Sequence, residues 1–230
     1  MIKRGGLALL VVVLLSAWGI SWLFSNKASP LFKPIEHYEL AGELHFLQPE
    51  AVDQVLNHYF GSSFWQVNLD EIQSDLVRLE WVSQAVVKRQ WPNRLYVSIE
   101  EQKPVARWGG FGLINQAGEV FFPQERGEFK DLVLLKGEEI DTKKMLSALV
   151  VFQAQLSALE FTIVSLKHQL DGVWWIRLLN GSEIILDSKE DEHKLETFIA
   201  AYPQLAKTLR KSAQVYDLRY SNGFIVGESQ

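Results

Sequence analysis

Residues 5–26 read GGLALLVVVLLSAWGISWLFSN and contain no charged side chain. At about 1.5 Å of rise per residue, a helix of about 22 residues is roughly 33 Å long, enough for a hydrocarbon core of about 30 Å. In lipid, a single segment can satisfy its own backbone hydrogen bonds only as a helix. Trp18 and Trp22 lie one helical turn apart near the end of the run, where aromatic rings favour the headgroup region. The stretch therefore predicts one membrane helix, with Leu7, Trp18 and Trp22 as its anchoring residues.

Residues 1–4 include the basic pair Lys3 and Arg4, which also suits the start of a cleavable signal peptide. Against cleavage, the apolar run is longer than the usual stretch of about 7–15 residues, and 26–28 is a poor cleavage site. An uncleaved anchor is therefore favoured. By a narrow margin, the basic pair keeps 1–4 in the cytoplasm and places the rest of the chain on the far side of the membrane.

The rest of the 230-residue chain is long enough for one large or two small domains. The formal net charge is -5 and there is no run of Lys or Arg, which argues against a nucleic acid partner. The chain has no cysteine, so disulfides and thiolate metal sites are excluded.

After a short linker at 27–33, the hydropathy pattern predicts a small α+β unit over 34–103. Its order is strand, helix, helix, strand, strand. Asn68, with Glu71 three residues later, forms a capping box that marks the start of the second helix. The expected elements are a strand at 35–40, helices that start at Pro49 and Asn68, and strands at 82–90 and 95–100.

From 104 to 227 the pattern changes to a β-rich region with two longer helices. One helix is expected at 142–160, and the other is capped by Ser188 and kinked by Pro203. The Asp171-Gly172 and Asn180-Gly181 pairs are predicted to form type I′ turns. The expected strands lie at 111–114, 120–122, 132–135, 163–168, 174–179, 183–186, 215–220 and 224–226.

No constellation of residues indicates an enzyme. The five His residues do not fall at the spacing of a metal motif, and there is neither a G-x-S-x-G motif nor a Cys nucleophile. The glycine-rich run 109–112 lacks the context of a phosphate-binding loop and is expected to be a turn between domains. Acidic residues at 187–192 complement the dipole at a helix start. The sequence therefore predicts no catalytic residue, no metal and no cofactor.

Residues 86–108 read VVKRQWPNRLYVSIEEQKPVARW, and residues 217–224 read DLRYSNGF. The first segment resembles the end of the POTRA module, and the junction into the β domain, of the FtsQ/DivIB family of bacterial division proteins. The second segment is similar to the closing strand of that family, although Tyr216 stands just before it where Val is expected. With the single membrane helix that precedes them, the resemblance covers essentially the whole chain.

This resemblance implies an α+β protein with one N-terminal transmembrane helix, a POTRA domain (β-α-α-β-β) at 34–103, a C-terminal β-rich domain with two helices at 104–227, and a tail at 228–230. It implies a single-pass protein of the inner membrane at the division septum, with its N-terminus cytoplasmic and its bulk periplasmic. It also implies a non-enzymatic scaffold that recruits FtsB and FtsL and links early to late division components. FtsK, FtsW and FtsI are left open as further partners. The tail 1–4 is short, which puts contacts inside the cell in doubt.

The last strand of the domain is the expected partner-binding site, because nothing later in the chain is available to cover its edge. Arg219 is expected to pair with carboxylates of the partner, and Tyr220 and Phe224 to act as aromatic anchors. For each residue, ordinary sheet packing is the alternative. The predicted partner-binding residues are Arg219, Tyr220, Ser221, Asn222, Gly223 and Phe224.

A second contact surface is open in the POTRA-like region, where Phe64, Trp65, Trp81 and Trp91 are candidates. Core filling is the favoured interpretation for these rings. A different class of function also stays open: a membrane-anchored envelope enzyme that hydrolyses peptidoglycan or peptides, or a POTRA-type export chaperone.

Overall fold

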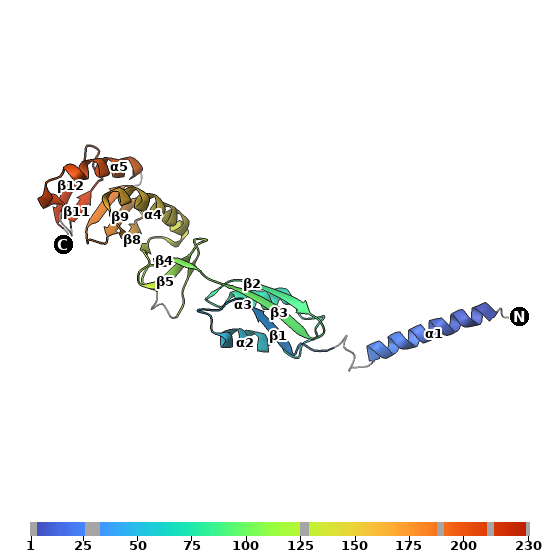
Figure 1. The fold of residues 1–230 in the computed structure, drawn as a ribbon. Coiled ribbons are helices and arrows are strands. Elements are labelled where there is room, and N and C mark those ends of the chain that lie inside the picture. Colours follow the sequence, from blue (N-terminus) through green and yellow to red (C-terminus); the bar gives the residue numbers. More distant parts are fainter. Residues whose placement is uncertain (1–3, 26–32, 125–128, 188–190, 211–213, 229–230) are drawn as a thin grey trace. The chain divides into compact units, whose positions relative to one another are not determined.

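The computed structural model describes residues 4–25, 33–124, 129–187, 191–210 and 214–228. The chain divides into two compact units, Met1–Gln102 and Lys103–Gln230. Each unit contains a β-sheet and helices that pack against it (Figure 1).

The apolar N-terminal run forms α1 (Arg4–Ser25). The Trp18 side chain is 70% exposed, and that of Ile20 is 56% exposed. Within the part of the chain that the structure describes, no helix combines the length and the apolar character needed to cross a membrane. The membrane span and its anchoring residues, Leu7, Trp18 and Trp22, therefore stay predictions. The side chains of Leu7 and Trp22 lie outside the described residues.

The first unit has the predicted β-α-α-β-β order, which the structure confirms. Its three-stranded sheet has the order β1-β3-β2, with β1 parallel and β2 antiparallel to the central β3. The parallel strands β1 and β3 need a long connection along the chain, and this connection contains both helices and β2 (Figure 1). The elements are β1 (His37–Ala41), α2 (Pro49–Asn57), α3 (Leu69–Val77), β2 (Val82–Gln90) and β3 (Arg94–Glu101).

Local sequence explains where these two helices begin. Pro49 occupies the first turn of α2, where no intrahelical bond needs its missing N–H. The Asn68 side chain accepts hydrogen bonds from the backbone N–H groups of Asp70 and Glu71, at 3.1 and 3.4 Å, and so caps α3 as predicted. The apolar stripe buried by each helix comprises Val52 and Leu56 in α2, and Ile72 and Leu76 in α3.

The first strand begins at His37 rather than at the predicted residue 35. The backbone of Ile35 bonds instead to the loop after α2. Its N–H donates to the Ser62 carbonyl at 3.0 Å, and its carbonyl accepts from the Gly61 N–H at 2.9 Å. Because the Ile35 side chain is fully buried, this residue belongs to the core without belonging to the sheet.

The second unit is built on a nine-stranded sheet of order β12-β11-β10-β9-β8-β7-β4-β5-β6. Its parallel neighbours include β7 with β8 and β10 with β11. These pairs need long crossovers, which hold α4 (Thr142–Leu156) and α5 (Asp191–Ala201). The strands are β4 (Pro104–Trp108), β5 (Gly112–Asn115), β6 (Val120–Phe121), β7 (Leu134–Lys136), β8 (Ile163–His168), β9 (Val173–Leu178), β10 (Glu183–Asp187), β11 (Gln214–Asp217) and β12 (Ile225–Glu228). The predicted β-rich domain with two helices is confirmed.

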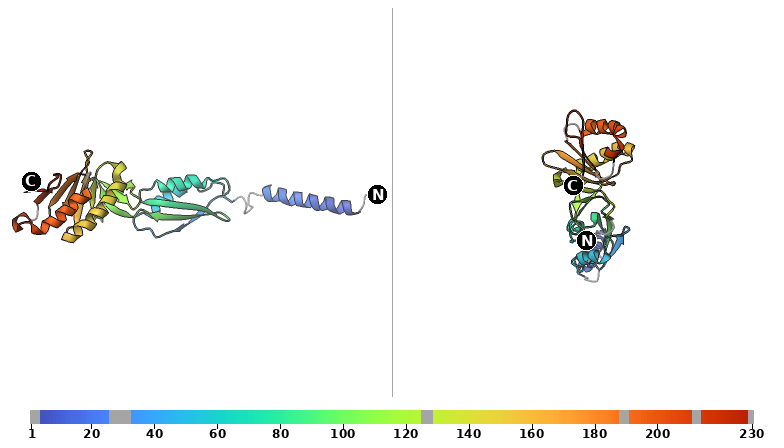
Figure 2. Two further views of the ribbon diagram at one scale, coloured as in Figure 1. Left: turned by 90° about the horizontal axis from the view of Figure 1, so that it is seen from above. Right: turned by 90° about the vertical axis from the view of Figure 1, so that its left-hand side faces the viewer.

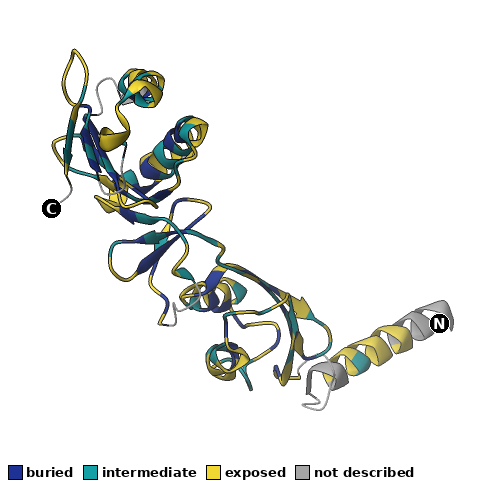
Figure 3. Cartoon of the chain, turned by 60° about the vertical axis from the view of Figure 1, so that its left-hand side comes forward, coloured by how far each residue is buried: buried dark blue, intermediate teal, exposed yellow. Residues whose placement is uncertain are grey.

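Helices α4 and α5 lie side by side over one face of this sheet (Figure 2). The buried residues gather between the helices and the strands beneath them (Figure 3). The core side chains include Met145, Phe152 and Leu156 from α4, Leu195 and Phe198 from α5, and Leu166, Trp174, Ile176, Ile184 and Tyr216 from the strands.

Three hairpin turns of this unit share one geometry that differs from the type I′ prediction. Gly118, Gly172 and Gly181 have φ values of 79°, 83° and 83°, and the N–H of each donates to the carbonyl three residues earlier at 2.9–3.0 Å. Asp171 and Asn180 do not have positive φ, so the type I′ prediction is wrong. These loops are type I turns closed by a glycine in the left-handed region, a common three-residue hairpin loop. The Asp171 and Asn180 side chains instead accept the backbone N–H two residues on, an Asx turn.

Other boundaries follow from backbone chemistry. The run 109–112 connects β4 to β5 inside the second unit, so its assignment to a turn between domains is wrong. The helix predicted at 142–160 ends in a 3-10 turn at Ser157–Leu159, where Glu160 takes a φ of 59°. Helix α5 gives way to a 3-10 turn that contains Pro203, as predicted. The predicted cap Ser188 lies outside the described residues.

Candidate partner-binding edge

The strand at one end of the nine-stranded sheet is β12. It pairs antiparallel with β11, where Tyr216 faces Val226 and Asp217 faces Ile225. Within the described ranges, no strand pairs with the other side of β12. An edge strand of this kind presents backbone N–H and C=O groups to which an extended segment of another chain can bond.

The six predicted partner-binding residues lie between β11 and β12. Residues 221–223 fall between the two strands as expected, whereas the placement of Arg219, Tyr220 and Phe224 on strands is wrong. β11 ends at Asp217 instead of at the predicted residue 220. The Leu218 N–H still donates to the Ile185 carbonyl of β10 at 2.7 Å, and the regular ladder then stops. The Asp217 carboxylate accepts the backbone N–H of Arg219 at 3.1 Å, a local bond that competes with continued strand pairing. The residues of this turn are Arg219, Tyr220, Ser221, Asn222, Gly223 and Phe224.

The Arg219 guanidinium is held inside the turn. Its Nε and Nη2 donate to the two carboxylate oxygens of Asp217, at 2.9 and 2.6 Å. The hydrogen bond from Arg219 is the main cause that lowers the pKa of Asp217, and the same bond raises the pKa of Arg219. The Arg219 side chain remains 46% exposed. A carboxylate of a partner would therefore compete with Asp217 for this cation.

The two predicted aromatic anchors behave differently. Tyr220 is 52% exposed. Phe224 packs on the core of its own unit, with its ring centroid 5.2 Å from that of Phe198 in an edge-on contact. Ile225, which the sequence reasoning missed, is 53% exposed at the start of β12. Tyr220 and Ile225 are thus the large hydrophobic side chains that the described part of the turn and the edge strand expose.

Helix α5 ties this turn to the sheet through Lys194. Its Nζ lies 3.0 Å from the Asp187 carboxylate and donates to the Arg219 carbonyl at 3.4 Å. With Tyr220 and Gly223, Lys194 lines a hollow of about 60 Å³. Small-molecule sites usually occupy about 300–1,000 Å³, so this region suits a protein segment better than a ligand.

Buried Tyr216 supports β11 from the core side. Its hydroxyl donates to the Leu209 carbonyl at 3.0 Å, and its ring lies 5.1 Å from that of Phe198. Burial raises the pKa of the Tyr216 hydroxyl, which therefore stays neutral. The prediction that a strand tolerates Tyr at this position is confirmed, because the side chain is fully buried within β11.

The second predicted surface, in the first unit, is divided between core and exterior. Phe64 and Trp81 are 2% and 7% exposed, whereas Trp65 and Trp91 are 55% and 61% exposed. Core filling is therefore the right interpretation for Phe64 and Trp81 and the wrong one for Trp65 and Trp91.

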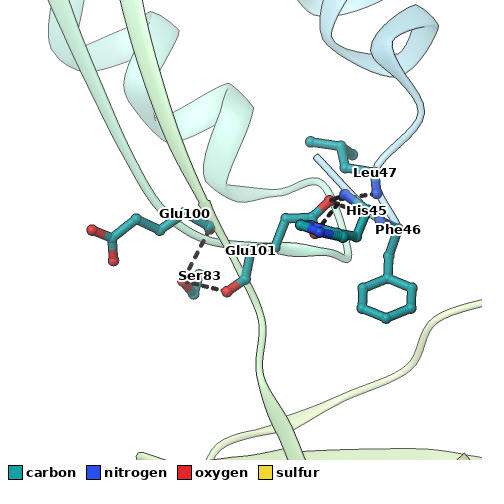
Figure 4. Close-up of polar contacts among 6 residues, drawn as sticks. All are labelled: His45, Phe46, Leu47, Ser83, Glu100 and Glu101. Atoms are coloured by element: carbon teal, nitrogen blue, oxygen red, sulfur yellow. Dashed lines mark hydrogen bonds and ion pairs between the residues drawn. The ribbon is translucent and has the colours of Figure 1, made fainter. Parts of the chain in front are cut away.

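Figure 4 shows a carboxylate site in the first unit that the sequence reasoning missed. Glu101, at the end of β3, accepts the backbone N–H groups of His45, Phe46 and Leu47 at 2.7–3.0 Å. Its side chain is only 9% exposed. Consecutive N–H groups of this kind form a ready anion site, and here the protein fills it with its own carboxylate. The partners are 54–56 residues apart, so no local sequence signal could have joined them.

The described residues contain no cluster of three or more His, Asp or Glu side chains that could hold a metal ion. His168 has its Nδ1 3.2 Å from an Asp141 carboxylate oxygen, and its ring lies 4.1 Å from the ring of Trp174. With its side chain 8% exposed, His168 is a packed residue of the fold.

Comparison with known families agrees with this two-unit organisation. The family model "POTRA domain, FtsQ-type" matches residues 33–102, and the model "Cell division protein FtsQ/DivIB, C-terminal" matches residues 106–219. A POTRA unit followed by this C-terminal unit defines a class of bacterial cell division protein.

Curated relatives match nearly the whole chain. The cell division protein FtsQ of Allochromatium vinosum is 31% identical over 216 residues, which cover 94% of this chain and 86% of the relative. That of Shewanella oneidensis is 33% identical over 204 residues, covering 89% and 77%. That of Coxiella burnetii is 31% identical over 220 residues, covering 96% and 88%. The chain belongs to the FtsQ/DivIB family of cell division proteins.

Proposed function

We propose that this chain is a non-enzymatic scaffold of the division machinery that recruits FtsB and FtsL by accepting a strand of the partner at the edge of β12. The family membership supports a role at the division septum. FtsK, FtsW and FtsI are further candidate partners of the same machinery.

The observation that carries the proposal is the open side of β12. The nine-stranded sheet ends there, and the described residues supply no further strand to cover it. Strand addition supplies affinity through main-chain hydrogen bonds and specificity through side chains that flank the strand. Exposed Tyr220 and Ile225 lie where such a segment would pass.

Anchoring in the inner membrane by α1, with the two units in the periplasm, is part of the same proposal. Its support is the uncharged run at 5–26, nearly all of which forms α1. The basic pair Lys3 and Arg4 supports a cytoplasmic N-terminus.

A pull-down with purified FtsB and FtsL tests the edge. Tyr220→Glu and Ile225→Glu should each reduce capture by about tenfold or more, because exposed anchors dominate interface energies. Val150→Glu is the matched control, since Val150 is 70% exposed on α4 of the same unit, away from the edge. All three variants should keep the thermal midpoint of the parent chain. Undiminished capture by both edge variants would refute strand addition at β12.

The alternative functions, an envelope hydrolase or an export chaperone, predict different results. Turnover of peptidoglycan or peptides by the purified chain would favour a hydrolase. Suppression of aggregation of unfolded exported proteins would favour a chaperone. Neither activity is expected, because the matching family models and the named relatives are those of cell division proteins.

A further inference from the structure

The exposed residues Trp65 and Trp91 lie at the same end of the first unit. β1 and β3 run parallel with His37 opposite Arg94, so the start of β1 and the β2–β3 turn share one end of the sheet (Figure 1). Trp91 lies in that turn. Trp65 follows the loop that bonds to the chain just before β1.

The segment that enters this unit pairs with both of the loops that carry Trp65 and Trp91. Pro34 forms an isolated antiparallel bridge with Ser63, two residues before Trp65. The Glu36 N–H donates to the Asn93 carbonyl at 3.1 Å, and the Asn93 side chain donates to Glu36 at 2.6 Å. Both Trp-bearing loops are therefore joined to the segment at which the chain enters the unit.

Arg89 makes this end rigid. Its guanidinium donates to the carbonyls of Phe64, Trp65 and Val67 at 2.7, 3.2 and 2.6 Å. The loop that carries Trp65 is thereby fastened to β2, whose next turn carries Trp91. Exposed large apolar side chains on a loop whose backbone is already ordered offer a contact surface at a reduced entropic cost.

The length of the connection decides what can meet this surface. Helix α1 ends at Ser25 and the bridge is made by Pro34, so nine residue steps, at most about 30 Å of chain, separate them. If α1 spans the bilayer, this end of the unit is tethered within reach of the headgroup region, where Trp side chains are enriched. Lys33 and Arg94 are exposed nearby and outnumber the exposed Glu36, so the local charge of this segment favours an anionic lipid surface.

We propose that Trp65 and Trp91 dock the POTRA unit onto the outer surface of the membrane in which α1 is anchored. The inference rests on the proposed anchoring by α1 and adds a second, peripheral contact to it. The contact would hold the unit against the bilayer and restrict the orientations that the unit takes relative to the membrane.

The absence of cysteine allows single probes to be placed at will. The full chain is reconstituted in phosphatidylcholine vesicles with about one quarter phosphatidylglycerol, so that the membrane carries the negative charge that attracts Lys33 and Arg94. A fluorophore is attached at Gln66→Cys, beside Trp65, or at Gln84→Cys, which is exposed near the far end of β2. Ile20→Cys reports on α1. Nitroxide lipids then quench each probe according to its closeness to the bilayer.

Quenching at position 66 is expected to exceed that at position 84 by about threefold or more, because Trp favours the interface. The double variant Trp65→Ser, Trp91→Ser should lower quenching at 66 to the level at 84 with an unchanged thermal midpoint. Quenching at 20 with equal, weak signals at 66 and 84 would overturn the docking while the anchor stands. No quenching at 20 would overturn the anchor itself, and with it the docking.

Discussion

Glu101 and Asp217 are acidic residues at the ends of strands, one in each unit, and each carboxylate shapes a loop by accepting backbone N–H groups. Glu101 binds three consecutive N–H groups of the loop before α2, which is remote in sequence. Asp217 binds the N–H of Arg219, two residues on, together with its guanidinium. The side chains of Glu101 and Asp217 are 9% and 16% exposed.

The two carboxylates differ in the distance along the chain to their partners, and this difference separates a loop that is part of the fold from a turn at a proposed binding edge. Glu101 closes a loop against the sheet, and Phe46 of that loop stacks on Trp81 at 4.5 Å. Asp217 acts within its own turn and leaves Tyr220 and Ile225 outside. A change at Glu101 should therefore affect folding of the first unit, whereas a change at Asp217 should affect mainly the shape of the proposed partner site.

The largest expected effect is that of Glu101→Ala. It leaves three backbone N–H groups without their acceptor, and such losses cost about 2–4 kcal/mol when the acceptor is charged and shielded. Chemical denaturation of the full chain measures the change. Glu100→Ala, at an exposed neighbour on the same strand, is the control and should stay within about 0.5 kcal/mol. A loss at Glu101 no larger than that at Glu100 would show that the loop does not depend on this carboxylate.

A smaller effect on stability is expected for Asp217→Ala, about 1 kcal/mol, because the ion pair is partly exposed and its bonds are local. Capture of FtsB and FtsL should fall more than this loss of stability explains, since the turn that presents Tyr220 loses the hydrogen bonds between Asp217 and Arg219. Parallel denaturation and pull-down measurements separate the two effects. A variant with lower stability and normal capture would make Asp217 a residue of the fold alone.

The smallest effect is a dependence on pH. Because the folded-state pKa of Asp217 lies below its usual value of about 3.9, its contribution to stability is present above about pH 4 and is lost as the pH falls through the folded value. The unfolding free energy of the parent chain should fall more steeply below pH 4 than that of Asp217→Asn. Denaturation curves between about pH 5 and pH 2 test this sign. Parallel curves for the two proteins would remove the ion pair as a source of stability.

Much of the local structure follows from residues that are close in sequence. Pro49 and Asn68 mark the helix starts because caps and first-turn positions involve only neighbouring backbone groups. β2 has its predicted bounds, and its C-terminal end follows from Pro92, which lacks the N–H that would extend the ladder. β4 was not expected, because its residues pair with β5 and with distant β7, and neither partner can be recognised from the strand alone.

The candidate site was located by sequence only approximately. The segment DLRYSNGF correctly locates the region of the proposed site, yet the strand predicted over 215–220 did not take into account the competing bond from the Arg219 N–H to the Asp217 carboxylate. That bond ends β11, moves Arg219 and Tyr220 off the predicted strand, and leaves β12 as the edge. Phe224 looked like an anchor because its aromatic character is visible in sequence, whereas its contact with Phe198 of α5 is not.

By itself, the sequence determined the apolar N-terminal helix, the order β-α-α-β-β, the cap at Asn68 and the family, because these depend on composition and on short-range patterns. Only the tertiary structure decided which strand lies at the sheet edge, which Trp rings are exposed and which loop Glu101 closes. The physical reason is that burial and strand pairing join residues that are far apart in the chain. The free energy of those contacts depends on neighbouring side chains that a short sequence pattern does not identify.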